Sequence, residues 1–363
     1  MQSARVSETM RCIKRASSQD GNVPKLFLED NEPRPSPGKN ELLVQVKACG
    51  LSLINHKNLT EIFKKEIRES YPVGQDIAGV ITQTGEGVIS YKAGDAVVGI
   101  MPLDSRYSGC GEFCCISEYD VVKKPSQLAF EDAAAAIGDC VSAYTALHYN
   151  AKVCAGDTLL VIGGATAAGN VLVQLGQRWG AKVLATYNTQ AERQHLEGIQ
   201  PPIAQVIELN KRNNILVSSV KEETGGVGVD CIVDDGVCMF TTEEDKALVG
   251  ENYKFPVPHK YDIISCLGFA GKWITAQPDL QLDPPDCQQL LLRGASVSFL
   301  FPPAWTLANV QQGRYQHILL DVVEKLDKGV IKCKIARLVT MDDVIESLKT
   351  LDEVRVGKVV LKF

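Results

Sequence analysis

The chain has 363 residues, of which 45% are hydrophobic and 23% charged, a composition ordinary for a soluble globular protein. Its net charge of −6, without a long cluster of Lys and Arg, excludes the basic surface of a nucleic-acid-binding protein. No apolar run reaches the length that spans a membrane. The length suits two domains better than one core.

The cysteines bear on the compartment of the protein. The chain contains 12 of them. The first 24 residues lack the apolar segment of a signal peptide and carry four basic residues, Arg5, Arg11, Lys14 and Arg15. Without an export signal, the cysteines are expected to be reduced thiols in a cytoplasmic protein.

The amino-terminal part of the chain is expected to form a β-rich domain. Residues 1–20 begin with a polar stretch and are expected to form a flexible leader. A charged segment, Ile54–Arg68, has a helical pattern. Short apolar segments separated by Gly and Pro predict strands at residues 42–48, 77–82, 95–100 and 113–116.

The pattern changes near Glu131, where an Ala-rich segment predicts helices that lead into a second domain. From there strands alternate with helices, and the first such unit is a βαβ motif in Thr158–Asn188. This alternation predicts a parallel, doubly wound sheet with helices on both faces. Further strands are expected at 204–209, 229–234, 262–268 and 295–301, with helices at 215–224 and 310–328.

The closing segment, GKVVLKF, predicts a last strand that returns to the β-rich domain. We therefore expect the β-rich domain to comprise residues 21–135 and 325–363. The doubly wound domain is expected to comprise residues 136–324, with a polar insertion at 241–260.

Several segments in this order resemble the medium-chain dehydrogenase/reductases. Within that family the chain is most similar to the zinc-free, zeta-crystallin-like quinone oxidoreductases and to a divergent animal branch of them. The resemblance implies a GroES-like β-rich domain and a Rossmann nucleotide-binding domain. It is carried by VKACGLSLIN (46–55), YPVGQDIAGVITQTGEGV (71–88), YKAGDAVVG (91–99), AYTALHY (143–149), LQLDPPD (280–286) and VGKVVLKF (356–363).

The resemblance also bears on metal binding. The positions that hold the catalytic zinc in the zinc alcohol dehydrogenases of this family carry Ser52, Gln75 and Gly138 here. None of these residues supplies the thiolate or imidazole that zinc needs. The cysteines in SGCGEFCCISE (108–118) are expected to be small buried thiols. No metal site is expected, which disfavours a zinc alcohol dehydrogenase.

The turn of the βαβ unit lacks the G-x-G-x-x-G order of a dinucleotide-binding loop. Thr166 and Ala167 stand where the family has its middle glycines. A left-handed Thr166 would cost about 1–2 kcal/mol and weaken cofactor binding, although its hydroxyl could donate to a phosphate. The alternative is a doubly wound domain whose nucleotide site has decayed. The cofactor-binding candidates here are Gly163, Gly164, Ala165, Thr166, Ala167, Ala168 and Gly169.

The end of the second strand bears on the choice of cofactor. Tyr187 and Asn188, also cofactor-binding candidates, are followed by no carboxylate of the kind that grips the ribose hydroxyls of NADH. The missing acid favours NADPH. Arg193 is placed where a guanidinium could meet a 2′-phosphate. The alternative for Arg193 is a solvated helix residue beside Glu192.

The resemblance implies that the nicotinamide supplies a hydride and that the protein supplies binding and orientation. Ser52 and Asn55 are the candidates near the substrate, and the sequence identifies no catalytic residue. By resemblance, four further residues are expected near the cofactor: Ser142, Gly268 and Phe299 beside the nicotinamide and Lys358 beside the phosphates.

The expected function is that of an NADPH-dependent, zinc-independent reductase of quinones or α,β-unsaturated carbonyls. The alternative is a catalytically weak or inactive Rossmann-fold protein that acts as an NADPH-sensing or protein-interaction module. The apolar strand at 295–301 is expected to be a sheet edge through which a homodimer forms.

Overall fold

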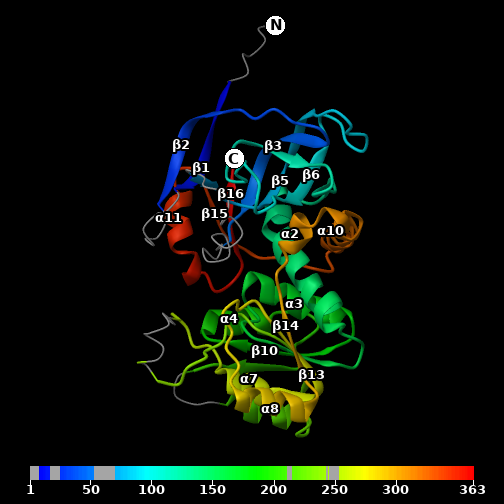
Figure 1. Cartoon of the computed structure of the whole chain (residues 1–363), viewed down its shortest axis with the longest axis vertical. Coiled ribbons are helices and arrows are strands. Elements are labelled where there is room, and N and C mark those ends of the chain that lie inside the picture. Colours follow the sequence, from blue (N-terminus) through cyan, green and yellow to red (C-terminus); the bar gives the residue numbers. More distant parts are fainter. Residues whose placement is uncertain (1–7, 17–24, 53–69, 211–214, 243, 245–252) are drawn as a thin grey trace. The chain divides into compact units, whose positions relative to one another are not determined.

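The structure of the chain, a computed structural model, describes residues 8–16, 25–52, 70–210, 215–242, 244 and 253–363 (Figure 1). The chain divides into two compact units. Unit 1 comprises Met1–Gly138, Pro303–Val354 and Lys358–Phe363, and unit 2 comprises Asp139–Pro302 and Arg355–Gly357. Pro303–Val354 thus lies in unit 1 as a whole, whereas the sequence placed residues up to 324 in the nucleotide-binding domain.

Unit 1 is built on a mixed sheet in the order β15-β16-β3-β5-β6-β8, with β7 paired to β3. The four strands predicted in this part of the sequence are confirmed. The last strand also returns here, since β16 pairs antiparallel with β3 through Val360 and Gly50. The strands are β3 (Glu41–Gly50), β5 (Asp76–Thr84), β6 (Ala96–Ile100), β7 (Phe113–Ser117), β8 (Val121–Lys123), β15 (Ile335–Val339) and β16 (Lys358–Lys362).

A second, smaller sheet in unit 1 has the order β2-β1-β4 and is formed by β1 (Thr9–Ala16), β2 (Leu26–Pro33) and β4 (Ser70–Pro72). The flexible leader expected over residues 1–20 is therefore wrong for β1. Met10, Cys12 and Ile13 are buried there, and burial of these apolar side chains holds the strand. The helix expected at Ile54–Arg68 lies outside the described residues.

Unit 2 contains a six-stranded parallel sheet in the order β11-β10-β9-β12-β13-β14. This is the doubly wound order, and its switch point lies between β9 and β12, where ligands bind at the carboxyl ends of the strands. Figure 1 shows α3 and α4 on one face of the sheet and α7 and α8 on the other. The strands are β9 (Thr158–Val161), β10 (Lys182–Tyr187), β11 (Gln205–Glu208), β12 (Val229–Val233), β13 (Leu267–Thr275) and β14 (Ser296–Phe299).

The strand predicted at residues 262–268 is wrong, because Lys260–Cys266 is the helix α7. Its start is capped: His259 Nδ1 accepts from the Tyr261 amide at 3.2 Å, and the Asp262 carboxylate accepts from the His259 amide at 3.3 Å. Such reciprocal bonds satisfy the amides that a helix start leaves free. The strand β13 begins only at Leu267.

The remaining helices follow the predicted alternation. The Ala-rich segment forms α2 (Phe130–Tyr144), which continues as a π-helical turn at Thr145–Ala151. The long helix predicted near the end of the chain is α10 (Gln312–Asp327), in unit 1. The others are α3 (Ala167–Arg178), α4 (Gln190–Glu197), α5 (Leu216–Glu223), α8 (Pro284–Arg293), α9 (Ala304–Leu307) and α11 (Val344–Lys349).

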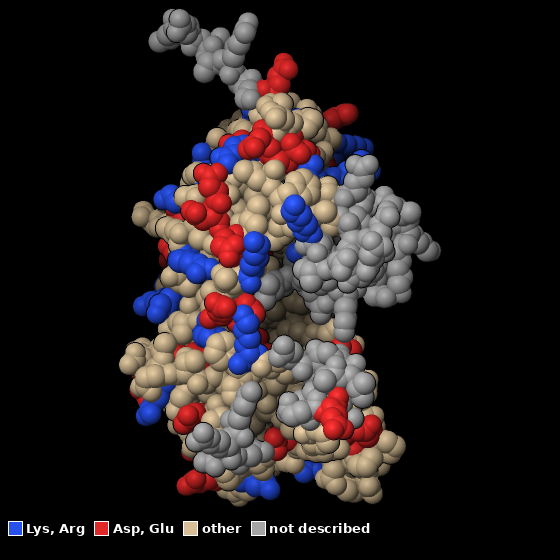
Figure 2. All heavy atoms as spheres, turned by 90° about the vertical axis from the view of Figure 1, so that its left-hand side faces the viewer, with Lys and Arg blue, Asp and Glu red and all other residues tan. Residues whose placement is uncertain are grey.

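The surface carries charges of both signs. On the face shown in Figure 2, Lys and Arg side chains alternate with Asp and Glu side chains, in keeping with the net charge of −6. Within the described ranges, no helix is both long enough and apolar enough to cross a membrane.

Candidate functional site

The turn after β9 brings the end of a strand and the start of a helix unusually close together. Gly163 has a φ of +70°, which favours glycine. A Cβ on Gly169 would lie 2.2 Å from the Gly163 carbonyl oxygen, and a Cβ on Gly164 would lie 2.7 Å from Ala185 Cβ. All three glycines are therefore required by this backbone, as in a dinucleotide-binding turn.

Thr166 closes this turn from within. It is extended, with φ −60° and ψ 165°, so the left-handed conformation considered from the sequence does not occur and its cost does not arise. The hydroxyl accepts from the Gly169 amide at 3.1 Å and donates to the Gly163 carbonyl at 2.9 Å. Thr166 is thus an N-cap of α3, and its hydroxyl hydrogen is used inside the turn instead of facing a ligand.

The groups that the turn can offer to an anion are backbone amides. The first-turn amides of a helix have no acceptor within the helix, and here Thr166 occupies only that of Gly169. The first turn of α3, with the amide of Ala168, lies at the positive end of the helix, whereas the side chain of Ala165 is buried. The start of a helix is a favourable place for an anion such as the diphosphate of a dinucleotide.

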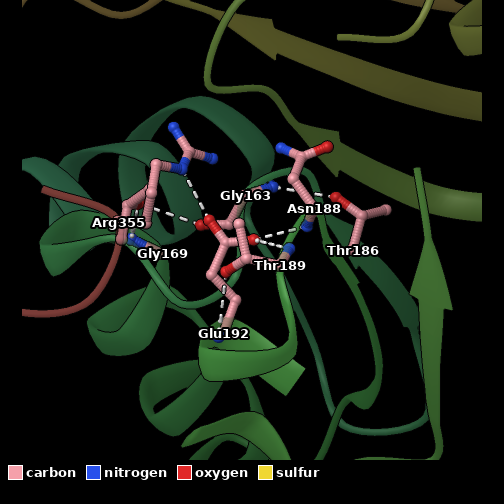
Figure 3. A network of polar contacts seen from close by, with 8 residues as sticks. Gly163, Gly169, Thr186, Asn188, Thr189, Glu192 and Arg355 are labelled. Atoms are coloured by element: carbon pink, nitrogen blue, oxygen red, sulfur yellow. Dashed lines mark hydrogen bonds and ion pairs between the residues drawn. The ribbon is translucent and has the colours of Figure 1, made fainter. Parts of the chain in front are cut away.

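A buried carboxylate lies at the end of β10 (Figure 3). Glu192, on α4, has 1% of its surface exposed. It accepts from the amides of Asn188 and Thr189, the second at 2.9 Å, and from Arg355 Nε at 2.6 Å. The acid that the strand end lacks in the sequence is therefore supplied by the next helix, with three donors already bound to it.

The sequence analysis missed this role of Glu192, although a signal was present. Thr189 and Glu192 have the spacing of a capping box, and the structure forms it, with Thr189 as N-cap. A capping box brings the side chain of its third helical residue back to the strand end. The arginine partner is not predictable in this way, since Arg355 lies 163 positions further along the chain.

Arg355 is held on several sides. Its guanidinium lies over the Phe255 ring, 4.6 Å from the centroid. With the Asn188 amide oriented so that its oxygen faces a donor, that oxygen accepts from Arg355 Nη2 at 3.1 Å. In the same segment Gly357 forms a parallel bridge with Thr166. The residues Arg355–Gly357 therefore complete both the end of β10 and the glycine turn at residues 163–169 of unit 2.

Arg193 faces a different partner from the one considered from the sequence. It pairs with Glu197 at 2.7 Å, whereas Glu192 points to Arg355. The pKa of Arg193 is raised, first by the bond to Glu197 and to a smaller extent by Tyr187. Arg193 therefore lies beside Tyr187 at the end of β10, with about half of its side chain exposed.

Two aspartates follow β12 at the switch point. Asp234 is buried and accepts from Trp273 Nε1 at 2.5 Å and from the Gly236 amide at 3.1 Å. The Asp235 carboxylate lies 2.9 Å from the position of a Cβ on Gly163. The surface of Asp235 is open to water, yet desolvation by the surrounding protein raises its pKa to about 7, against a lowering effect of Arg355.

The three residues expected beside the nicotinamide lie at different places in the fold. Gly268 lies at the start of β13, which runs on to Thr275, so it stands at the amino edge of the sheet, away from the phosphate turn. The prediction for Gly268 was wrong because it assumed that the strand ended there. Phe299 ends β14 opposite Thr275, at the carboxyl edge, and Ser142 is half-buried on α2.

In unit 1, two of the predicted site residues contact each other, since the buried ammonium of Lys358 binds Ser52. Lys358 Nζ donates to Ser52 Oγ at 2.8 Å and lies 3.4 Å from Asp76 Oδ2. The side chains of Lys358 and Asp76 are 8% and 7% exposed, whereas Ser52 is exposed. The phosphate contact expected for Lys358 stays a prediction. Asn55 lies outside the described residues.

The positions that match zinc ligands do not fit a zinc ion. Gln75 Nε2 donates to the Met101 carbonyl at 3.0 Å, and a Cβ on Gly138 would lie 2.3 Å from Asp76 Oδ1. A cysteine at position 138 would thus displace the partner of Lys358, and the ammonium itself repels a cation. In the part of the chain that the structure describes, no group of three His, Cys, Asp or Glu side chains is placed to hold a metal.

Two cysteines of β7, Cys114 and Cys115, are free, buried thiols. Desolvation raises the pKa of Cys115 to about 12 and that of Cys114 further. A thiol that does not ionise is a poor nucleophile and a poor metal ligand. The prediction of small buried thiols is confirmed for these two cysteines.

Comparison with known proteins places this geometry among oxidoreductases. Residues 38–150 match the alcohol dehydrogenase GroES-like domain. The chain is 41% identical to mouse quinone oxidoreductase-like protein 1 over 87% of its own length and 88% of that protein. It is 28% identical to human quinone oxidoreductase over 55% of the chain and 59% of that protein. The solved structure of CurK enoyl reductase has the same fold, with a TM-score of 0.75 at 21% identity, over 96% of this chain and 98% of that one.

Proposed function

Because this chain belongs to the medium-chain dehydrogenase/reductase superfamily, among its quinone oxidoreductase-like proteins, we propose that it is an NADPH-dependent reductase of quinones or α,β-unsaturated carbonyls that works without zinc. Membership of this family implies a nicotinamide cofactor and a small-molecule substrate. When bound, the cofactor supplies the hydride. The choice of NADPH, the substrate class and the absence of zinc are the proposal.

The observation that carries the proposal is the cradle formed by Gly163, Gly164 and Gly169. Side chains at these positions would collide with the backbone or with packed neighbours, and the cradle ends at the first turn of α3. The turn therefore keeps the close approach of strand and helix that a dinucleotide-binding loop has. The phosphates would be held by backbone amides, so the loss of middle glycines from the sequence is compatible with binding.

The preference for NADPH is supported by the state of Glu192. A carboxylate that selects NADH must be free to accept from the ribose hydroxyls. Glu192 is buried and already accepts from Arg355 and two amides. Arg193 is left half-exposed beside Tyr187, where its guanidinium is available to a 2′-phosphate.

Titration of the full-length protein with NADPH and NADH, followed through Trp fluorescence, tests cofactor binding. We expect saturable binding with NADPH at least tenfold tighter than NADH, and Arg193→Met to reduce that ratio. An assay of NADPH oxidation with quinones and enones then tests turnover. Absence of NADPH binding at millimolar concentration contradicts the proposal, and binding without any turnover favours the NADPH-sensing alternative.

We also propose a homodimer formed through β14, in the cytoplasm. The strand lies at the sheet edge, where Phe299 is 58% exposed. Phe269, Leu291 and Leu292 of the same unit are also exposed apolar residues. Light scattering should give twice the chain mass, and Phe299→Asp should give the monomer. A monomeric parent protein contradicts the proposal.

A further inference from the structure

The direction of the hydrogen bond between Lys358 and Ser52 leaves the hydroxyl hydrogen of Ser52 available for a ligand. An ammonium has only donors, so in the bond between them Ser52 Oγ is the acceptor. The hydroxyl hydrogen of Ser52 is therefore directed elsewhere, and the described residues provide no acceptor for it. Since Ser52 is exposed and Lys358 is 7% exposed, the pair presents a polarised hydroxyl to solvent and hides the charge that polarises it.

The surroundings keep the ammonium in place. Asp76, on β5, is 5% exposed and lies 3.4 Å from Lys358 Nζ. Two further titratable groups near Asp76 have a raised pKa, the Tyr315 hydroxyl on α10 first through burial and the Cys49 thiol on β3 first through its bond to Cys110, and the charge of Asp76 adds to both. Both groups stay neutral, and among the described residues Asp76 is a carboxylate that pairs with Lys358. A compensated positive charge behind a hydroxyl is suited to stabilise an oxyanion.

We propose that Ser52, held by Lys358, is the oxyanion-binding group and proton donor of this protein. This inference rests on the proposed function and assigns a role within it: the ligand is the carbonyl oxygen of the quinone or enone. Ser52 would be the catalytic residue that touches the substrate. Lys358 would be a positioning residue that acts through it.

The reaction balances with groups already named. Hydride addition at the β-carbon of an enone moves the C=C electron pair toward the carbonyl, and negative charge arises on the carbonyl oxygen. That oxygen takes the proton of Ser52, forming an O–H bond as the serine O–H bond breaks. Ser52 recovers a proton from the Lys358 ammonium, and solvent water returns one to the resulting amine.

The first test uses the full-length protein without cofactor and 4-nitrophenol, a phenol whose anion is coloured and resembles the enolate. We expect the protein to bind the anion about tenfold more tightly than the neutral phenol, seen as a lowered pKa of the bound dye. Ser52→Ala should abolish this preference, and Ser52→Thr should restore it. The matched control is Lys362→Met, which removes an exposed lysine from the same strand and should leave the preference intact.

Lys358→Met leaves Asp76 without its cation and can fail to fold, so Lys358→Arg is the informative variant. Arginine keeps the positive charge but does not release its proton at ordinary pH. We expect Lys358→Arg to retain most of the anion preference, to lower kcat about tenfold or more, and to remove the alkaline limb of the kcat–pH profile. A lysine with a structural role alone would leave the shape of that profile unchanged.

Turnover with NADPH completes the test. Ser52→Ala should lower kcat about 10²-fold, with little change in the Kd of NADPH, because the phosphate turn lies in the other unit. Equal affinity of the parent protein for nitrophenol and its anion overturns the inference, as does full kcat in Ser52→Ala. Failure of the proposed function looks different: NADPH binding or turnover is then absent in the parent, while the anion preference persists.

Discussion

The glycine turn of unit 2 (residues 163–169) and the cluster of Ser52, Lys358 and Asp76 in unit 1 use a hydroxyl group in opposite ways. In the turn, the hydroxyl of Thr166 is bound internally at both of its ends, and the ligand is left with backbone amides. In the cluster, Lys358 binds the Ser52 oxygen and leaves its hydrogen for a ligand. Backbone sites tolerate changes of side chain as long as the fold of the turn is kept. Side-chain sites depend on residue identity.

The largest effect is expected where a side chain supports the backbone site. Glu192→Ala removes the acceptor of Arg355 and of the amides of Asn188 and Thr189. Breaking a buried pair leaves unpaired donors behind, and we expect the free energy of unfolding to fall by about 3 kcal/mol. Urea unfolding measures it. Arg193→Met is the control, because its exposed pair with Glu197 should not move the urea midpoint. Equal changes of the urea midpoint in the two variants would contradict a stabilising role of the bonds between Glu192, Arg355 and the two amides.

The next effect concerns the close approach in the turn. Gly169→Ala places a Cβ 2.2 Å from the Gly163 carbonyl oxygen, so the backbone must shift. We expect a loss of about 2 kcal/mol in the free energy of unfolding and at least tenfold weaker NADPH binding. Gly313→Ala is the matched control, because a Cβ there meets nothing within 4 Å and the helix α10 gains stability. Thermal unfolding and fluorescence titration measure both. Normal NADPH binding by Gly169→Ala would show that the cradle of Gly163, Gly164 and Gly169 does not bind the cofactor.

A smaller effect on stability is expected at Thr166. Variants of this residue distinguish phosphate binding by backbone amides from phosphate binding by a side-chain hydroxyl. Thr166→Ala removes the N-cap and should cost about 1 kcal/mol of stability, whereas Thr166→Gly should cost only a few tenths. If backbone amides hold the phosphates, NADPH binding should change only a few-fold in both variants. Isothermal titration calorimetry measures the affinity. A hundredfold loss in Thr166→Gly would show that the hydroxyl itself contacts the cofactor.

The smallest effect is a pH dependence that comes from Asp235. Its pKa of about 7 lies above the value of about 3.9 in an unfolded chain. The folded state therefore holds a proton that the unfolded state has lost, and the resulting stability is present at low pH and is lost as pH rises through 7. An ionised Asp235 beside Gly163 should also repel the diphosphate, so NADPH affinity should fall roughly threefold from about pH 6 to about pH 8. Fluorescence titration at both pH values measures it. Asp235→Asn should remove the fall, and a fall that persists in that variant would assign it to another group.

The sequence predicted most of the fold because buried strands have clear patterns. The β9–α3–β10 unit and the return of β16 to β3 followed from apolar runs and spacing. The helix α7 was missed because its apolar residues are Ile263 and Ile264, which also favour a strand, and because its N-cap is a histidine. The strand β1 was missed because charged residues separate its buried ones.

The candidate site was predictable only where its contacts are local. Thr166 and the three glycines stand in one turn, and the sequence identified Thr166 and Ala167 as its departure from the dinucleotide-binding pattern, although the conformation of Thr166 had to come from the structure. The bond between Ser52 and Lys358 joins residues 306 positions apart, and no local pattern specifies such a contact. Only the folded sheet, in which β16 pairs with β3, brings those two segments together.

The path of the chain after Val354 has a consequence for biosynthesis. Arg355–Gly357 belongs to unit 2, and the chain then re-enters unit 1 as β16. Every contact described for this segment is with a residue that the ribosome has added earlier. While the nascent chain is still shorter than this, Glu192 has no arginine, Ser52 has no lysine, and β3 presents an open edge. Neither unit can therefore finish folding during translation before the residues at 355–362 have left the exit tunnel.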